Sequence, residues 1–149
     1  MRETLNAALK SAMKAGERRR VDTIRMINAA LKDRDIEARA QGKVVAEPEI
    51  LALLQKMVKS REESRGIYTK AGRDELAAQE AEEIAIIQEF MPRQMDEADV
   101  GAAVDAAIAE TGAASIKDMG KVVGVLKTKF AGQMDFGKAS ALIKARLSG

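Results

Sequence analysis

The amino-acid sequence predicts an all-α protein, with an N-terminal four-helix domain followed by a small C-terminal three-helix bundle. The chain of 149 residues is 46% hydrophobic but only 3% aromatic, and it has no tryptophan. Its core must therefore be built from Leu, Ile, Val, Met and Ala, a set that favours helices over sheets. The chain has only two prolines, and we find no run in which apolar and polar residues alternate as in a half-buried strand.

The first two helices are expected at about 3–15 and 18–40. Apolar residues recur in each at helical spacing, and Gly16 and Gly42 follow the last periodic residues, where glycines commonly end helices. The residues expected to face the core are Leu5, Leu9 and Met13 in the first helix and Val21, Ile24, Ile27 and Leu31 in the second.

The third and fourth helices are expected at about 48–71 and 74–90, on either side of Gly72. Pro48 suits the first turn of one, and Asp74 suits the N-cap of the other. The residues expected to face inward are Ile50, Leu54, Met57, Arg61, Ser64, Tyr68 and Ala71 in the third helix and Leu76, Ile84, Ile87 and Phe90 in the fourth. The acidic side chains of the fourth helix expected to lie mostly outward are Glu80, Glu82 and Glu83.

Pro92 marks the predicted boundary between two domains, at 1–92 and 93–149. Proline breaks the helix before it, and Asp96 can restart the chain as an N-cap with Asp99 at the third helical position. The helices of the second domain are expected at about 97–110, 115–131 and 136–147. The expected caps of the last two are Ser115 paired with Asp118, a variant of the capping box, and Asp135.

Two absent residue types narrow the chemistry. The chain has no cysteine and no histidine, which excludes thiol nucleophiles, disulfides and iron–sulfur ligands, as well as imidazole bases and common catalytic zinc sites. The N-terminal segment has no long apolar stretch, so we expect neither a signal peptide nor a membrane span. We expect a cytoplasmic protein with no catalytic residue, no metal and no cofactor.

The charge is distributed unevenly, although the net charge of the whole chain is only +2. Residues 93–110 contain one base and five acids, whereas residues 111–149 contain seven bases and two acids, for a local net charge of +5. Such an excess is typical of a surface that binds an anionic partner, most often a nucleic acid. A solvated helix surface that binds nothing has the same composition, so both interpretations stay open.

The segment GKVVG places Gly120 and Gly124 four residues apart inside a helical pattern. Each glycine costs a helix interior about 1 kcal/mol relative to alanine. At 100° per residue the two glycines lie about 100–140° from the centre of the apolar face, with Lys127 near 80° and Lys117 near 160°. Lys121 is about 60° beyond Gly124. Bare backbone flanked by lysines suits either close packing of another helix or approach of a sugar–phosphate backbone.

Six segments, three in each half of the chain, together form a pattern. In the C-terminal half they are MGKVVGVL at 119–126, the G-x-M-D-x-G pattern at Gly132–Gly137, and KASALIKARL at 138–147. In the N-terminal half they are TIRMINAALK at 23–32, KAGR at 70–73 followed by Leu76, and EFMPRQM at 89–95. These segments span nearly the whole chain in the order found in the GatB/YqeY family, and the chain resembles a stand-alone member of that family.

The resemblance implies a tRNA-contacting domain without the chemistry of an amidotransferase. The family's small helical domain also forms the tail of the B subunit of the tRNA-dependent Asp/Glu-tRNA amidotransferase, where activation and amide transfer belong to a larger catalytic domain. That domain has no counterpart here. The residues that the resemblance places toward RNA or a partner are Lys117, Gly120, Lys121, Gly124, Lys127, Gly132, Gly137 and Lys138. Many members have a base where this chain has Gln133.

Three functional hypotheses follow. The first is a non-catalytic accessory protein of tRNA or translation that binds RNA through its basic C-terminal domain. The second is a protein-interaction module that docks a partner helix on the strip formed by Gly120 and Gly124. The third is a component of a glutamine-dependent aminoacyl-tRNA amidotransferase, a carbon–nitrogen ligase that would act with other subunits. The expected partners are therefore tRNA and an amidotransferase or other translation protein.

Overall fold

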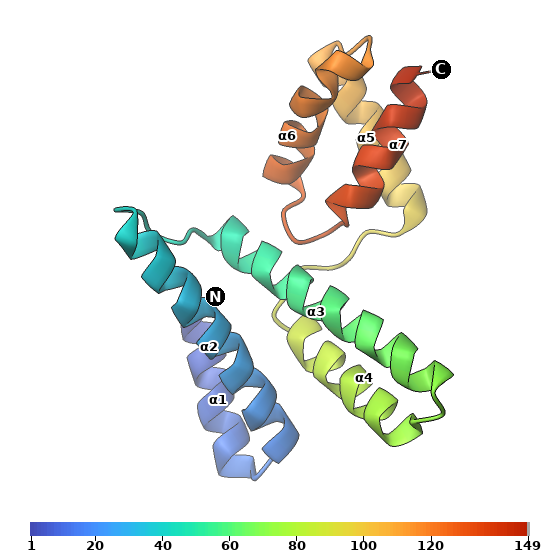
Figure 1. Ribbon diagram of the computed structural model, residues 1–149. Coiled ribbons are helices and arrows are strands. Elements are labelled where there is room, and N and C mark those ends of the chain that lie inside the picture. Colours follow the sequence, from blue (N-terminus) through green and yellow to red (C-terminus); the bar gives the residue numbers. More distant parts are fainter. Residues whose placement is uncertain (149) are drawn as a thin grey trace. The chain divides into compact units, whose positions relative to one another are not determined.

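The computed structural model describes residues 1–148, which form helices joined by turns and no strand, and this confirms the all-α prediction (Figure 1). The chain divides into two compact units, Met1–Pro92 and Arg93–Gly149, and each unit has its own hydrophobic core. The helices are α1 (Arg2–Ala15), α2 (Arg18–Ala40), α3 (Glu47–Lys70), α4 (Asp74–Gln88), α5 (Glu97–Thr111), α6 (Met119–Lys129) and α7 (Phe136–Ser148), with a 3-10 turn, η1 (Ile116–Asp118), directly before α6.

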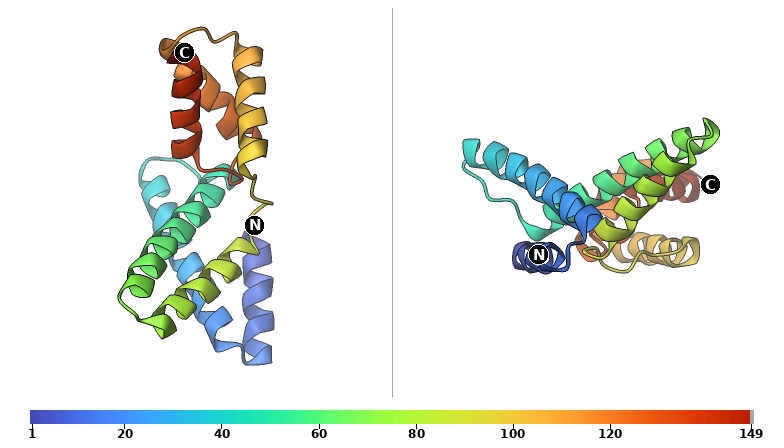
Figure 2. Two further views of the ribbon diagram at one scale, coloured as in Figure 1. Left: turned by 90° about the vertical axis from the view of Figure 1, so that its right-hand side faces the viewer. Right: turned by 90° about the horizontal axis from the view of Figure 1, so that it is seen from below.

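Two helical hairpins, α1–α2 and α3–α4, build the N-terminal unit, and α2 packs against both α3 and α4 (Figures 1 and 2). The predicted apolar stripe of α2 is confirmed, since all four of its residues are buried. The same holds for Ile50 and Leu54 of α3, for Ile84 and Ile87 of α4, and for Phe90, which lies in the turn just after α4. The core consists of Leu5, Ile24, Ile27, Leu31, Val45, Ile50, Leu53, Leu54, Val58, Ile84, Ile87 and Phe90, to which Val21 of the α2 stripe adds a buried side chain.

Two large apolar residues expected in this core, Met13 and Leu76, are exposed, and both errors have the same cause. Met13 is 53% exposed while Ala12 is fully buried, and Leu76 is 37% exposed while Ala77 is 9% exposed. Met13 lies eight residues after Leu5, and Leu76 lies eight residues before Ile84; eight residues turn a helix by about 80° past its starting direction. Ala12 and Ala77 lie seven residues from the same buried side chains, and seven residues return to within about 20° of that direction. The alanines therefore lie on the core face, and the larger side chains beside them do not.

The ends of α3 and α4 also differ from expectation. The third helix ends at Lys70, so Ala71 is its C-cap and is exposed rather than inward-facing. Arg73 is the N-cap of α4 and caps no backbone N–H with its side chain, while Asp74 is the first helical residue. A carboxylate at that position still interacts favourably with the positive end of the helix dipole.

A buried ion pair joins α3 to α4, and it corrects the expectation that Glu83 faces outward. Glu83 is 7% exposed, and Nε of Arg61 donates to its Oε2 at 3.0 Å. Arg61 also donates through Nη1 to the carbonyl oxygen of Met57 at 3.1 Å. Burial, and then the neighbouring charge of Glu83, raise the pKa of Glu80. The polar middle of α3 therefore meets a polar partner inside the unit.

The C-terminal unit is a bundle of α5, α6 and α7. Its core residues are Ala103, Val104, Ala107, Val122, Leu126, Met134, Ala139 and Ile143. The predicted capping box of α5 is confirmed, because the Asp99 N–H donates to Asp96 Oδ1 at 2.8 Å and the Asp96 N–H donates to Asp99 Oδ2 at 3.4 Å. Asp135 caps α7 as predicted, accepting from the Gly137 N–H at 2.8 Å.

We predict that Arg61→Met lowers the free energy of unfolding by about 3 kcal/mol, because it leaves the carboxylate of Glu83 buried and unpaired. Adding Glu83→Leu to this variant should recover most of the loss, since a matched apolar pair no longer buries a charge. Urea unfolding measures both effects.

The control is Arg19→Met, which breaks the ion pair of Arg19 with Glu82, where both side chains are largely exposed. Its cost should stay below about 1 kcal/mol. An Arg61→Met variant no less stable than Arg19→Met would contradict the assignment.

Candidate nucleic-acid interface

The eight residues proposed from the sequence lie at three places in the C-terminal unit. Five lie on η1 and α6, one lies in the turn between α6 and α7, and two lie in the first turn of α7. In that order they are Lys117, Gly120, Lys121, Gly124 and Lys127, then Gly132, then Gly137 and Lys138. We call the first five the glycine strip.

The rotation of α6 about its axis decides what the glycine strip presents. Val122 and Leu126 are fully buried, and Met119, Val123 and Phe130 pack against the same core. The apolar face calculated from the helical wheel is therefore the face that packs. Both strip glycines are exposed on the other side of the helix.

No structural requirement for glycine is found at either strip position. Neither Gly120 nor Gly124 has a positive φ. A Cβ atom added at either one would meet no heavy atom within 4 Å outside its own helix backbone. Among the residues that the structure describes, no other helix uses the bare backbone as a packing surface.

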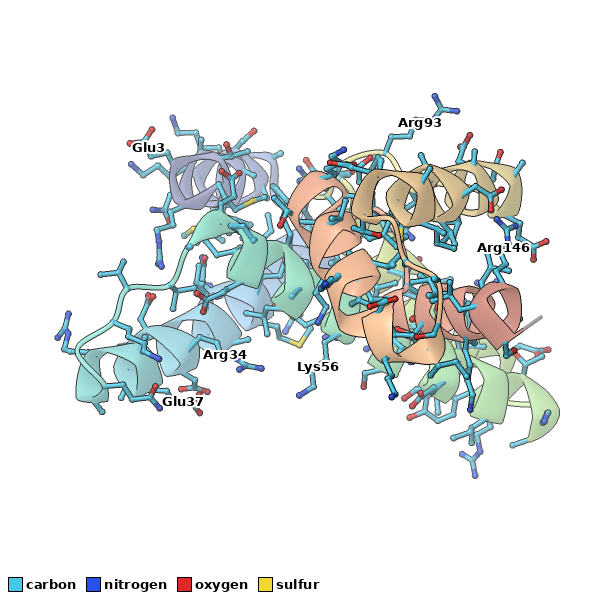
Figure 3. The ribbon with its side chains drawn as sticks, turned by 90° about the horizontal axis from the view of Figure 1, so that it is seen from above. Glu3, Arg34, Glu37, Lys56, Arg93 and Arg146 are labelled. Atoms are coloured by element: carbon cyan, nitrogen blue, oxygen red, sulfur yellow. The ribbon has the colours of Figure 1, made fainter. Side chains whose placement is uncertain are left out.

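Ion pairs within the unit separate the bases into two groups. Lys129 Nζ lies 2.6 Å from Glu110 Oε2, and Arg146 pairs with Asp105 and donates to the carbonyl oxygen of Gly101 at 3.1 Å. Figure 3 shows Arg146 reaching from α7 toward α5. The acidic helix α5 thus neutralises one base of α6 and one of α7.

The remaining bases of the segment are lysines that form no ion pair among residues 93–148. Lys144 was not among the residues proposed from the sequence, and only the count of charges in the segment could have indicated it. All of these lysines are exposed. They are Lys117, Lys121, Lys127, Lys138 and Lys144.

The two acids of the segment are held by backbone groups. Asp118 Oδ2 accepts from the Ala114 N–H at 3.0 Å and the Ser115 N–H at 3.3 Å. These hydrogen bonds, helped by the nearby charge of Lys121, lower the pKa of Asp118. The expected helix start at Ser115 thus takes the form of a 3-10 turn rather than the first turn of α6.

Gly132 lies apart from the glycine strip and has a structural explanation. Its φ is 76°, a left-handed conformation that residues with a Cβ rarely adopt. Its carbonyl oxygen accepts from Gln94 Nε2 at 2.6 Å, and the carbonyl of Gln133 accepts from the Met95 N–H at 2.9 Å. The turn therefore holds the segment that leads into α5.

Gly137 and Lys138 lie at the N-terminal end of α7. A Cβ on Gly137 would come within 3.1 Å of Asp135 Oδ1, which its own N–H already approaches. Lys138 lines a groove of about 500 Å³ between α5 and α7, to which the described residues of α6 contribute nothing. These two residues therefore belong to a different face from the glycine strip.

No three or more Asp or Glu residues come together as a metal-binding group among residues 1–148. Over the same residues, no helix has the length and hydrophobicity that crossing a membrane requires.

The fold and its surface define a class of protein: a small all-helical protein whose C-terminal unit exposes bare helix backbone between unpaired lysines. The family model described as Yqey-like protein matches residues 2–147. The chain therefore belongs to the Yqey-like protein family. Comparison with curated protein sequences gave no significant match.

We predict that Gly120→Ala and Gly124→Ala each stabilise the C-terminal unit by about 0.5–1 kcal/mol, because alanine removes the helix penalty of glycine and its Cβ meets open space. Thermal unfolding followed by circular dichroism measures the effect. Gly132→Ala is the control and should destabilise, since φ is positive there. Loss of stability in either strip variant would show that the glycines are needed for folding.

We predict that Asp118→Asn destabilises the protein at pH 7 and that the difference from wild type shrinks in acid. The pKa of Asp118 is lowered in the folded state, so its contribution is fully present above 3.8, its unperturbed value, and is lost as the pH falls through the lower folded value. Urea unfolding of both proteins across pH 3–7 provides the measurement, with Glu62→Gln as an exposed control. A difference independent of pH would contradict the role of the carboxylate charge.

Proposed function

We propose that the C-terminal unit binds the sugar–phosphate backbone of RNA at the glycine strip, and that the protein is a non-catalytic accessory of tRNA or translation. The observation that carries the proposal is the combination of two helix glycines that folding does not require with lysines that form no ion pair in their own unit.

The glycines are costly unless something approaches them. Alanine fits at both positions, so the chain gives up about 1–2 kcal/mol of stability by having glycine at Gly120 and Gly124. A missing Cβ lets a ligand approach the helix axis more closely than any side chain would allow. An exposed pair one helical turn apart is suited to an extended ligand that lies along or across the helix.

The flanking lysines favour an anionic ligand. Lys127 lies on one side of the glycines, and Lys117 and Lys121 lie on the other. A phosphate backbone between them would be neutralised from both sides, with release of its counterions. Of the neighbouring acids, Glu110 and Asp105 are already paired with other bases. Asp118 lies near Lys121, and its carboxylate is held by two backbone N–H groups.

Membership of the Yqey-like family supports RNA rather than another polyanion. The segment MGKVVGVL, which contains the strip, is the one that resembles the tail of the amidotransferase B subunit. For that tail the expected ligand is tRNA. We therefore propose tRNA as the RNA to test first.

We predict that reversing Lys117, Lys121 and Lys127 together to glutamate lowers the affinity for tRNA at least 50-fold at low salt, because three phosphate contacts become repulsive. Filter binding or fluorescence anisotropy with the full chain measures this. The matched control reverses Lys10, Lys32 and Lys56, three exposed lysines of the N-terminal unit, and changes the net charge equally. Absence of tRNA binding by the wild-type protein at low salt would refute the proposal.

The open strip also suits a second function, docking of a partner helix. Small residues one turn apart allow two helices to pack very closely. In this case Gly120→Leu and Gly124→Leu would release a co-purifying protein, while the lysine reversals would matter little. Treating the purified complex with nuclease separates the two functions, since only RNA is removed by it.

A further inference from the structure

The two aromatic residues of the C-terminal unit are only partly exposed. Phe130 and Phe136 are its only aromatic residues, and both pack against the hydrophobic core. Proteins that hold single-stranded RNA usually stack its unpaired bases on exposed aromatic side chains, and each base contributes appreciably to affinity. Along the described part of this unit, no aromatic side chain is fully exposed to serve as such a platform.

The side chains of the glycine strip have little capacity to read a base sequence. Of the side chains that usually recognise base edges, which are Arg, Lys, Asn, Gln, Asp, Glu, Ser and Thr, the strip contains only lysines. The guanine edges that lysine contacts lie in the major groove, which is too deep and narrow in double-helical RNA for side chains to read. The nearest hydroxyl on the same helix, that of Thr128, donates to the carbonyl oxygen of Gly124 at 2.9 Å. What remains available is positive charge and bare backbone.

The arrangement of the lysines fits phosphates that lie on both sides of a groove. Lys121 and Lys127 are six residues apart on α6, a distance of about 9 Å along the helix axis, and Lys117 lies in the turn η1 just before this helix. Double-helical RNA has a wide, shallow minor groove with 2′-hydroxyls at its floor and phosphates along both edges. A helix without side chains at its centre could lie against such a floor while its flanking lysines reach the edges.

We propose that the ligand of the glycine strip is the backbone of double-helical RNA, bound by shape and charge without sequence readout, rather than an unpaired single strand. This inference rests on the proposed RNA-binding function and adds to it the structural class of RNA that is bound. A flexible single strand would have to be ordered on binding and would gain no stacking in return.

The test compares one RNA hairpin of about 20 base pairs, a second hairpin of unrelated sequence, and an unstructured oligouridine of equal total length. Fluorescence anisotropy with the full chain at low salt gives each affinity. We expect the two hairpins to bind within threefold of each other and at least 10-fold more tightly than the single strand.

The salt dependence gives a second readout on the same material. Three phosphate contacts correspond to a slope of about −2.7 in log K against log salt, equivalent to about 40-fold weaker binding at 200 mM than at 50 mM salt. Lys127→Ala should reduce the slope by about 0.9 for both hairpins, while Lys56→Ala should leave it unchanged.

The possible failures are distinguishable. Equal or tighter binding of the oligouridine would overturn the inference while leaving RNA binding intact. A strong preference between the two hairpins would also overturn it, because base readout would then be required. If none of the three RNAs binds, the proposed function itself fails.

Discussion

Burial of Val122 and Leu126 is the constraint on which the candidate surface depends. Both side chains are fully buried in the core of the C-terminal unit, and together they fix the rotation of α6 about its axis. A rotation of one residue, about 100°, would carry a glycine into the core and a valine into solvent. Because burying a valine or leucine contributes about 1.5–3 kcal/mol, the outward position of the glycines is enforced by packing on the opposite face.

Charge pairing makes a second selection among the residues that packing leaves exposed. Seven bases follow residue 110 in the sequence, but Lys129 and Arg146 are paired with acids of α5. The acids of the segment itself are held as caps by backbone N–H groups, as Asp118 shows. The acidic character of α5 therefore does not cancel the basic surface as a whole. It neutralises particular bases and leaves the lysines beside the glycines available.

Much of the architecture could be predicted from local pattern, because helix boundaries depend on neighbouring residues. The caps at Asp96 and Asp135 and the apolar stripe of α2 needed no knowledge of the rest of the chain. Glu83 could not be placed in this way. Its burial depends on Arg61, which is 22 residues away on another helix, and a charged side chain is normally placed outside unless such a partner is known. The burial of Ala12 in place of Met13 was missed for a geometric reason. Residues spaced four apart move progressively away from one face of a helix, whereas residues spaced seven apart stay on it.

The glycines illustrate what structure adds to a resemblance. On sequence alone, Gly120, Gly124, Gly132 and Gly137 are equivalent members of one motif. The backbone separates them, because Gly132 has a φ that demands glycine and Gly137 leaves room for the carboxylate of Asp135. Folding therefore explains two of the four and gives no reason for the other two. The glycines without a folding role are also the two that lie between lysines without an ion pair. Contact with a phosphate backbone explains both features. Packing of a partner helix would need the glycines but not the charges, so it explains less.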